Sequence, residues 1–149
     1  TGRLAPGNPM PEFKLSVGKD TLSNESFKGS VYVLEIAGLT ADTFQDQFVE
    51  LNSIVPLYSQ RNVRWLTIPL DPQTTIDAFV DSKKPNWKFA NAHNFENYRL
   101  MDSLNIIQIP TRFLVDKDGK IIRKYKPSEI NWLLNDILKA VRTEDDENS

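Results

Sequence analysis

The residue types that most often carry chemistry in proteins are scarce in this chain. Its 149 residues include no cysteine and a single histidine, His93. Without cysteine there is no thiolate nucleophile, no disulfide and no cysteine-ligated metal site. A single histidine also argues against a histidine-rich metal centre and against a mechanism that needs a histidine pair. We therefore expect no catalytic residue, no metal and no cofactor.

Glu35 is the acidic residue with the most unusual sequence surroundings. It lies within the run Val31–Ala37, in which every other residue is hydrophobic. Removal from water disfavours the charged form of a carboxyl group. Two interpretations follow: a buried, protonated acid, or a carboxylate satisfied by a lysine or by backbone donors. We favour the second interpretation, because buried polar groups in proteins are nearly always hydrogen-bonded.

The remaining ionisable residues are better explained by structure than by catalysis. Asp116 and Asp118 lack the rest of a calcium-loop pattern, and a turn between two strands explains both. His93 lies in the polar segment 91–94 and is typical of a solvated loop histidine. Three further aspartates are typical of surface charges beside a helix: Asp71, Asp77 and Asp81.

Composition and charge narrow the class of protein. Hydrophobic residues make up 40% of the chain and charged residues 26%, with a net charge of −2, as in ordinary globular domains. Nucleic-acid binding usually needs a basic surface that neutralises phosphates, so we expect no nucleic-acid partner. The longest apolar run, Val31–Leu39, contains Glu35 and is too short to cross a bilayer, so we expect no membrane insertion.

The first part of the chain predicts an arm followed by strands. Residues 1–12 contain glycines and prolines that interrupt regular structure. Phe13–Val17 alternates apolar and polar residues, as a half-buried strand does. Residues 22–27 are expected to form a short strand or a helical turn. Val31–Ala37 is typical of a parallel strand that is covered on both faces.

A helix is predicted after Gly38, with Thr40 or Asp42 as its capping residue. Its apolar residues recur at helical spacing: Phe44, Phe48, Leu51, Val55 and Tyr58. The elements expected next are a strand at 63–70, a helix at 74–80, a short strand at 87–90 and a helix at 96–104.

The last part of the chain predicts a hairpin and a closing helix. Strands are expected at 111–116 and 120–125, joined by a turn in which Gly119 supplies a positive φ. A helix that opens at Pro127 carries apolar residues at helical spacing: Ile130, Leu133, Leu134, Ile137, Leu138 and Val141. We therefore predict an α/β fold with a central mixed sheet flanked by helices on both faces, because a strand–helix–strand unit gives a parallel pair and a hairpin an antiparallel one. The expected organisation is an arm at 1–12, a domain at 13–142 and an acidic, flexible tail at 143–149.

This order of elements, with Ile109-Pro110-Thr111 before the hairpin, resembles the thioredoxin superfamily. The closer resemblance is to its TlpA/ResA and peroxiredoxin-related group. Four stretches carry it, and together they extend over most of the chain: GNPMPEF at 7–13, FKGSVYVLEI at 27–36, IPT at 109–111 and FLVDKDGKI at 113–121. The resemblance implies a thioredoxin-like fold.

The resemblance also implies where the chemistry of the family would reside. The Cys-x-x-Cys motif of related proteins corresponds to Ala41 and Phe44, so both thiols are missing. Glu35 corresponds to a buried acid that assists proton transfer to a thiol. Thr40 and Thr43 are poor substitutes, because a hydroxyl needs a positioned base to become a nucleophile. We therefore predict that the chain has no thiol–disulfide oxidoreductase or peroxidase activity.

In related proteins, the proline that corresponds to Pro110 follows a cis peptide bond. Such a loop would leave the backbone of Ile109 open to an extended peptide, although the loop could equally be a relic that only fixes local geometry. Three tryptophans are further candidates for a binding cleft. Trp65 and Trp132 fit core positions better, whereas Trp87 is expected to be partly exposed.

Our leading hypothesis is a redox-inactive, thioredoxin-like domain that binds a protein or peptide partner. The predicted surface consists of Thr40, Ala41, Asp42, Thr43, Phe44, Ile109 and Pro110. Free N–H groups at the helix start could receive a carboxylate or a carbonyl oxygen from the partner. The alternatives are a structural module of a larger envelope assembly and an enzyme with non-thiol chemistry. The resemblance implies a periplasmic or cell-envelope location, since many related proteins face that compartment.

Overall fold

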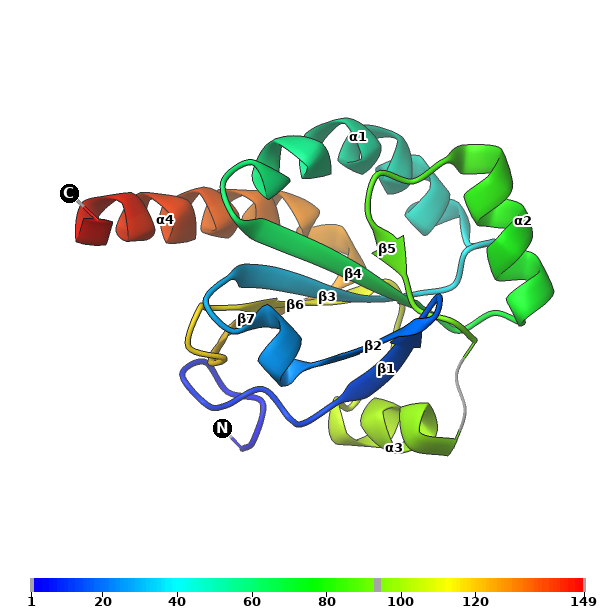
Figure 1. Ribbon diagram of the computed structural model, residues 1–149, viewed down its shortest axis with the longest axis horizontal. Helices are drawn as coiled ribbons and strands as arrows, with labels where there is room; N and C mark the ends of the chain where they lie inside the picture. The colour runs from blue at the N-terminus through cyan, green and yellow to red at the C-terminus, as the bar shows by residue number, and fades with distance from the viewer. Residues whose placement is uncertain (1, 93–94, 149) are drawn as a thin grey trace.

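The computed structural model describes the backbone of residues 2–92 and 95–148, and their side chains except those of 95–98 and 144–148. Five strands form one sheet in the order β5-β4-β3-β6-β7 (Figure 1). The strands are β3 (Val31–Ala37), β4 (Val63–Pro69), β5 (Lys88–Phe89), β6 (Thr111–Val115) and β7 (Ile121–Tyr125). A separate hairpin pairs β1 (Lys14–Val17) with β2 (Asp20–Ser23).

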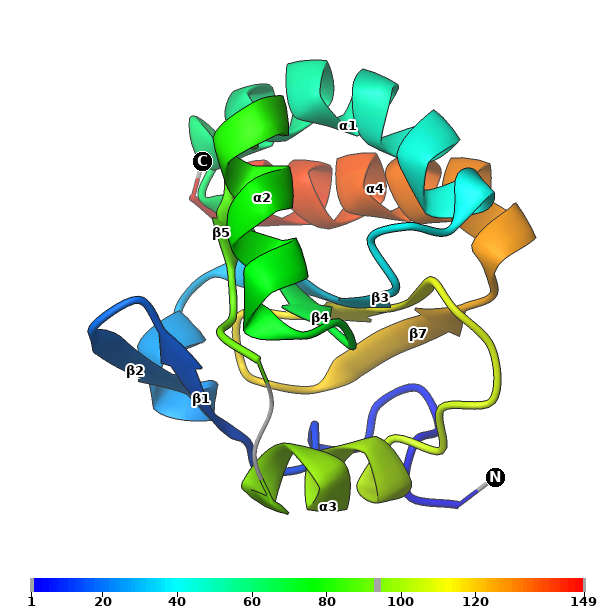
Figure 2. The same ribbon diagram turned by 90° about the vertical axis from the view of Figure 1, so that its right-hand side faces the viewer.

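Helices cover both faces of the five-stranded sheet, as the sequence predicted. On one face lie α1 (Asp42–Ser59), α2 (Gln73–Lys83) and α4 (Ile130–Asn148), and on the other lie α3 (Phe95–Ser103) and the β1–β2 hairpin (Figure 2). Two short 3₁₀ helices, Asn24–Phe27 and Pro127–Glu129, precede β3 and α4.

The sheet is mixed because its connections differ. Strand β3 pairs in parallel with β4 through the crossover helix α1, and antiparallel with β6. Strands β6 and β7 form the predicted hairpin, in which Gly119 has a φ of 83°. Glycine adopts this left-handed conformation without the steric cost of a Cβ.

Alternate residues of β3 build two different cores, since successive side chains of a strand point to opposite faces. Tyr32, Leu34 and Ile36 pack towards the β1–β2 hairpin and α3. Val31 and Val33 pack towards α1 and α4. All seven residues of β3 are buried, which confirms the prediction of a strand covered on both faces.

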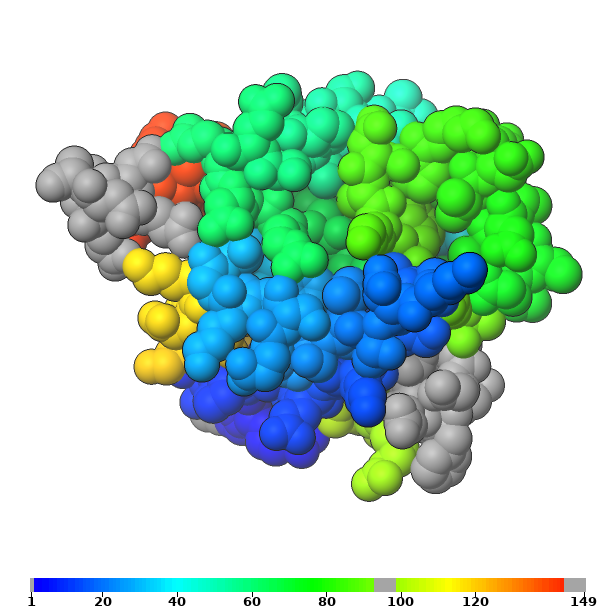
Figure 3. Space-filling view, viewed as in Figure 1, coloured from blue at the N-terminus to red at the C-terminus, as the bar shows by residue number. Residues whose placement is uncertain are grey.

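The N-terminal segment packs against the β6–β7 hairpin (Figure 3). The N–H group of Gly7 donates to the carbonyl oxygen of Ile121, and the N–H group of Ile121 donates to the carbonyl oxygen of Asn8. The side chain of Met10 is only 4% exposed and belongs to the core. The expected arm therefore contributes both backbone pairing and an apolar side chain to the domain.

Helix α1 begins differently from the prediction. Its N-cap residue is Ala41, and neither Thr40 nor Asp42 caps the helix. The carbonyl oxygen of Ala41 accepts the N–H of Gln45, at 3.0 Å. Hydrogen bonds between the loop and neighbouring side chains fix this start, so a side-chain cap is not required.

Helix α4 extends beyond residue 142, where the sequence pattern placed the start of a tail, and continues to Asn148. A helix can continue past the end of its apolar stripe, because each added residue gains one backbone hydrogen bond. Among the described residues, no helix is both long enough and apolar enough to span a membrane.

Candidate functional site

The sheet brings the helix start and the Ile109–Pro110 loop together. Strand β3 ends at Ala37 and β6 begins at Thr111, and the two strands pair so that Ile36 lies opposite Thr111. The segments that follow β3 and precede β6 therefore meet at one end of the sheet. A Cβ placed on Gly38 would lie 2.9 Å from Cδ1 of Ile109, so glycine permits this close approach. The Ile109–Pro110 peptide bond is cis.

Exposure divides the seven predicted surface residues. Thr40, Asp42 and Thr43 are exposed, and the side chains of Ala41 and Ile109 are half-buried. Two residues lie beneath this surface rather than on it: Phe44 and Pro110. The surface that a partner could contact is therefore smaller than predicted.

Phe44 belongs to the core, where its ring contacts Phe79 at a centroid distance of 5.8 Å and Phe48 at 6.0 Å. It is 0% exposed. The helical spacing of the sequence already assigned Phe44 to the buried stripe of α1, and that signal should have removed it from the predicted surface. Phe44 therefore serves the core and is not available to a partner.

Two side chains hold the loop between β3 and α1. The Oδ1 atom of Asp71 accepts the N–H of Leu39 at 2.9 Å, and Nε2 of Gln45 donates to the carbonyl oxygen of Leu39 at 3.0 Å. Asp71 is half-buried, so the expectation of a plain surface charge was wrong. The Asp71 carboxylate accepts the N–H of Leu39, just beyond the end of β3, where none of the described strands provides an acceptor.

Glu35 is fully buried at the centre of the sheet, on the face covered by α1. Its Oε2 atom accepts Nε of Arg112 at 2.7 Å, and its Oε1 atom accepts the hydroxyl of Thr67 at 2.5 Å. Both partners lie directly opposite Glu35 on the neighbouring strands. The sequence predicted a satisfied carboxylate but named the wrong donors: the cation is an arginine, and the second donor is a threonine hydroxyl.

Further hydrogen bonds extend this buried pair in both directions. Nε1 of Trp87 donates to Oγ1 of Thr67 at 2.8 Å. On the other side, Nη1 of Arg112 donates to Oε1 of Gln47 at 2.9 Å, and Nε2 of Gln47 donates to the carbonyl oxygen of Pro127 at 2.9 Å. The network links strands β3, β4 and β6 to helix α1 and to the start of α4.

Sequence reasoning missed Arg112, although it is only 1% exposed and carries the opposite charge. Arg112 lies in the run Thr111–Val115 beside residues that predict a strand, as Glu35 does in Val31–Ala37. Two oppositely charged residues, each inside an apolar strand, are the signal that could have paired them. The pairing itself depends on strand order, which the sequence does not state.

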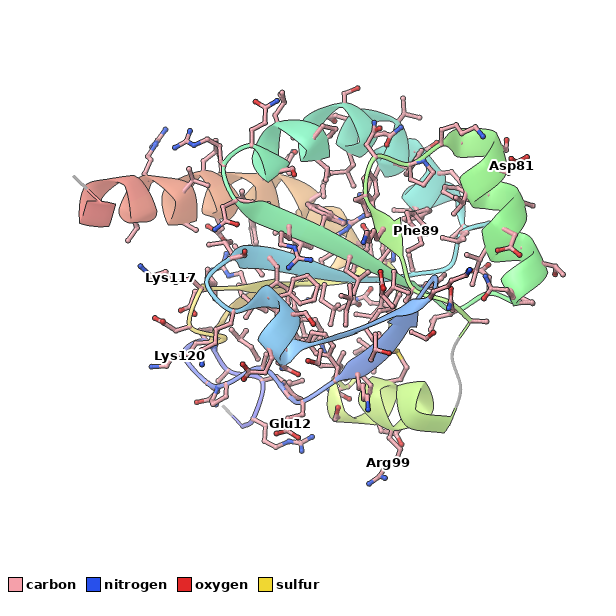
Figure 4. All side chains as sticks on the ribbon, in the orientation of Figure 1. Glu12, Asp81, Phe89, Arg99, Lys117 and Lys120 are labelled. Carbon is pink, nitrogen blue, oxygen red and sulfur yellow. The ribbon has the colours of Figure 1, made fainter. Side chains whose placement is uncertain are left out.

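The other singled-out residues lie outside this site. Asp116 is confirmed as a turn residue, since its Oδ1 accepts the N–H groups of Asp118 and Lys120. Asp81 projects from the outer surface of α2, as Figure 4 shows. His93 lies outside the described residues. No group of three or more potential metal ligands occurs in the part of the chain that the structure describes.

The tryptophans were predicted correctly in two cases out of three. Trp65 is buried and Trp87 is half-buried, with ring centroids 6.0 Å apart. Trp132 is 55% exposed, so its assignment to the core was wrong. Its ring lies beside β7, where the guanidinium of Arg123 is 5.6 Å from the ring centroid.

Fold and site together define a domain of the thioredoxin-like class. Solved structures with the same fold include a thiol:disulfide interchange protein from Bacteroides sp., with a TM-score of 0.80 and 19% identity, covering 94% of this chain and 92% of that one. Another is a thiol:disulfide interchange protein of the thioredoxin family from Chlorobium tepidum TLS, with a TM-score of 0.74 and 15% identity, covering 92% and 98% of the two chains. The predicted thioredoxin-like fold is thus confirmed.

The chain belongs to the AhpC/TSA family, whose model matches residues 6–124. Over 142 residues it is 25% identical to the thiol-disulfide oxidoreductase ResA of Bacillus thuringiensis subsp. konkukian. The match covers 87% of this chain and 81% of that protein. The predicted relationship is therefore confirmed, and this chain contains no cysteine.

Proposed function

We propose that this chain is a redox-inactive, thioredoxin-like domain that binds a protein or peptide partner. The binding surface consists of Thr40–Thr43 at the start of α1 together with Ile109. The observation that carries the proposal is the close approach of Gly38, before α1, to Ile109 in a chain that has no thiol. The proposal is supported by a thioredoxin-like fold in which the helix start and the cis Ile109–Pro110 loop lie together, in a chain that has no cysteine.

The exposed residues give this surface the properties of a binding site for a polar, extended segment. Thr40, Asp42 and Thr43 present hydroxyl and carboxylate groups to solvent. The N–H groups of the first turn of α1 have no partner within the helix, so they can donate to carbonyl oxygens of a bound segment. Ile109, whose Cδ1 atom lies close to Gly38, adds a half-buried apolar side chain to this surface.

A comparison of matched variants tests this surface. The intact chain, Asp42→Arg and Ile109→Lys would each be used to capture proteins from an envelope extract, with Asp81→Arg on the outer side of α2 as the control. A protein bound by the intact chain and by the control should be lost by at least about tenfold with either site variant, since one unfavourable contact of this kind costs roughly 1.4 kcal/mol. Equal capture by all four proteins would exclude the surface.

The redox-inactive part of the proposal has a separate test. In an insulin-reduction assay with dithiothreitol, the chain should give no rate above the background, because it has no thiolate to attack a disulfide. A clear rate above background would contradict the proposal without bearing on partner binding.

A structural module is the second candidate function, and exposed apolar residues away from Ile109 favour it. Val49 and Leu57 on α1 are 72% and 59% exposed. Because they are eight residues apart, they share one face of that helix. The capture experiment distinguishes the two functions, since a partner bound through α1 would be lost with Val49→Glu and kept with Ile109→Lys.

We extend the proposal to location. Similarity to ResA supports a domain that faces the periplasm or the cell exterior. Fractionation of the cells that naturally produce this protein, with detection by an antibody raised against residues 1–149, tests it. Recovery in the cytoplasmic fraction would contradict the proposed location.

A further inference from the structure

Strand β5 covers only part of the edge of β4. Strand β4 spans seven residues, but β5 pairs only with Leu66 and Thr67. Among the described strands, none pairs with residues 63–65 on this edge. Unpaired backbone groups at a sheet edge can accept another strand.

The backbone of the open part faces outwards. The N–H of Ala90 donates to the carbonyl oxygen of Thr67 at 2.8 Å, so Thr67 directs its backbone groups towards β5. Backbone groups alternate along a strand between its two neighbours. Val63 and Trp65 therefore direct their N–H and C=O groups to the same edge, beyond the start of β5.

A groove of about 150 Å³ follows this edge. It lies on the face shown in Figure 3, where the green surface of α1 and β4 meets the blue surface of β2 and the turn after it. The indole N–H of Trp65 is buried in the wall of the groove, and it has no acceptor among the described residues. The lining residues are Leu22, Phe27, Val55, Ser59, Val63, Arg64, Trp65, Leu66, Asn86, Trp87 and Lys88.

Charge and ring positions divide the groove into two sides. Arg64 lies opposite Tyr32, and Lys88 lies opposite Leu66, so both cations share the face of the β1–β2 hairpin. Trp65 packs on the other face, beneath α1. Among the described lining residues there are two cations and no carboxylate. An added strand would therefore meet cations on one side and an aromatic surface on the other.

We propose that the open edge of β4 binds an extended peptide segment of a partner protein, in which acidic and apolar residues alternate, as an added strand. The period of two places every carboxylate beside Arg64 and Lys88 and every apolar side chain beside Trp65. Main-chain hydrogen bonds supply affinity, and alternate side chains supply specificity. This edge is independent of the Thr40–Thr43 surface, because Val63 pairs with Val31 at the opposite end of β3.

The probe is a fluorescent six-residue peptide of alternating glutamate and valine, titrated with the full chain and followed by anisotropy. Two further peptides have the same sequence but carry N-methyl groups on alternate residues, one peptide in each phase. Methylation in the phase that faces β4 should weaken binding by at least about tenfold, because it removes the paired N–H donors. Failure of the unmodified peptide to bind, or equal binding by both methylated forms, would overturn the proposal.

Protein variants test the charge pattern. Lys88→Glu should weaken binding of the peptide by about fivefold, which corresponds to one solvent-exposed charge pair. Lys83→Glu, an exposed lysine at the end of α2, is the matched control and should bind normally. Equal binding by both variants, or tighter binding of a lysine–valine peptide, would contradict the assignment of an acidic partner.

Two further outcomes separate this edge from its rivals. Asp42→Arg should bind the peptide as the intact chain does, so failure of the proposed partner surface leaves this result unaffected. Self-association of the chain that Lys88→Glu abolishes, seen by sedimentation at increasing concentration, would assign the edge to a second copy and overturn the peptide proposal.

Discussion

Glu35 and Arg112 place opposite charges in a part of the protein where charge is costly. Each ion loses its hydration on burial, and the attraction between them recovers that loss only when the geometry is good and other hydrogen bonds are made. Thr67 and Gln47 provide those bonds. A slip of one residue in the pairing of β3 with β6 would move Arg112 to the opposite, apolar face. The pair therefore selects one register for the central strands.

Single and double substitutions distinguish register selection from simple stabilisation. Glu35→Leu and Arg112→Met should each lower the free energy of unfolding by about 3 kcal/mol, because each leaves its buried, oppositely charged partner uncompensated. The double variant Glu35→Leu/Arg112→Met should lose much less than the sum, since neither charge remains. Urea unfolding of the three variants measures these differences. Additive losses would show that the two side chains do not act as a pair.

Hydrogen bonds between Asn52 and Asn86 join helix α1 to the segment before β5, and a proline in the helix makes one of them possible. Pro56 lies inside α1 and has no N–H group, so the carbonyl oxygen of Asn52 lacks its usual helical donor. Nδ2 of Asn86 donates to that oxygen at 2.8 Å, and the N–H of Asn86 donates to Oδ1 of Asn52 at 2.8 Å. These bonds hold residue 86 against α1, and strand pairing with β4 begins only at Lys88.

The Asn52–Asn86 connection has a measurable consequence. Asn86→Ala should lower the free energy of unfolding by about 1–2 kcal/mol, because it removes the side-chain donor to Asn52. Asn52→Ala should have a similar effect, because it removes the Oδ1 acceptor of the Asn86 N–H group. Thermal unfolding with each variant provides the measurement. The exposed Ser53 offers a control on the same helix, because Ser53→Ala should change the unfolding temperature little.

At the scale of the whole molecule, burial of tyrosine couples stability to alkaline pH. Burial raises the pKa of Tyr32, and the negative charge of Asp116 raises it further. Burial, followed by the hydrogen bond to Asp136, raises the pKa of Tyr125. The unfolded chain loses these phenolic protons near pH 10, whereas the folded chain keeps them. The stabilising effect is therefore present below pH 10 and is lost as the pH rises above it.

The pH dependence can be isolated with one conservative substitution. Between pH 9 and 11.5 the free energy of unfolding should decrease, by at most about 1.4 kcal/mol per pH unit for each buried tyrosine. Tyr32→Phe should make the decrease shallower. The hydroxyl of Tyr32 has no hydrogen-bond partner among the described residues, so this variant should retain its stability at pH 7. An unchanged slope in the variant would contradict the role of Tyr32.

The sequence alone determined the elements and the missing chemistry. Apolar runs and helical spacing locate the strands of the five-stranded sheet and the starts of the helices that flank it within a few residues. They do so because a buried face must repeat with the period of its element. The sequence also shows by itself that the chain has no thiol group, since no fold can supply a missing side chain. The helical period also assigns Phe44 to the core, because Phe44 falls on the buried stripe of α1.

Only the tertiary structure decided which distant residues meet. Glu35 and Arg112 are 77 residues apart, and their ion pair exists because β3 and β6 are neighbours in one register. The contact of Gly38 with Ile109 and the open edge of β4 likewise depend on strand order and on where β5 begins. Periodicity reports the environment of a residue along its own element, but its partners are set by the packing of several elements at once. The chain itself therefore specified a thioredoxin-like domain without thiols, and the folded structure decided which surfaces that domain offers to a partner.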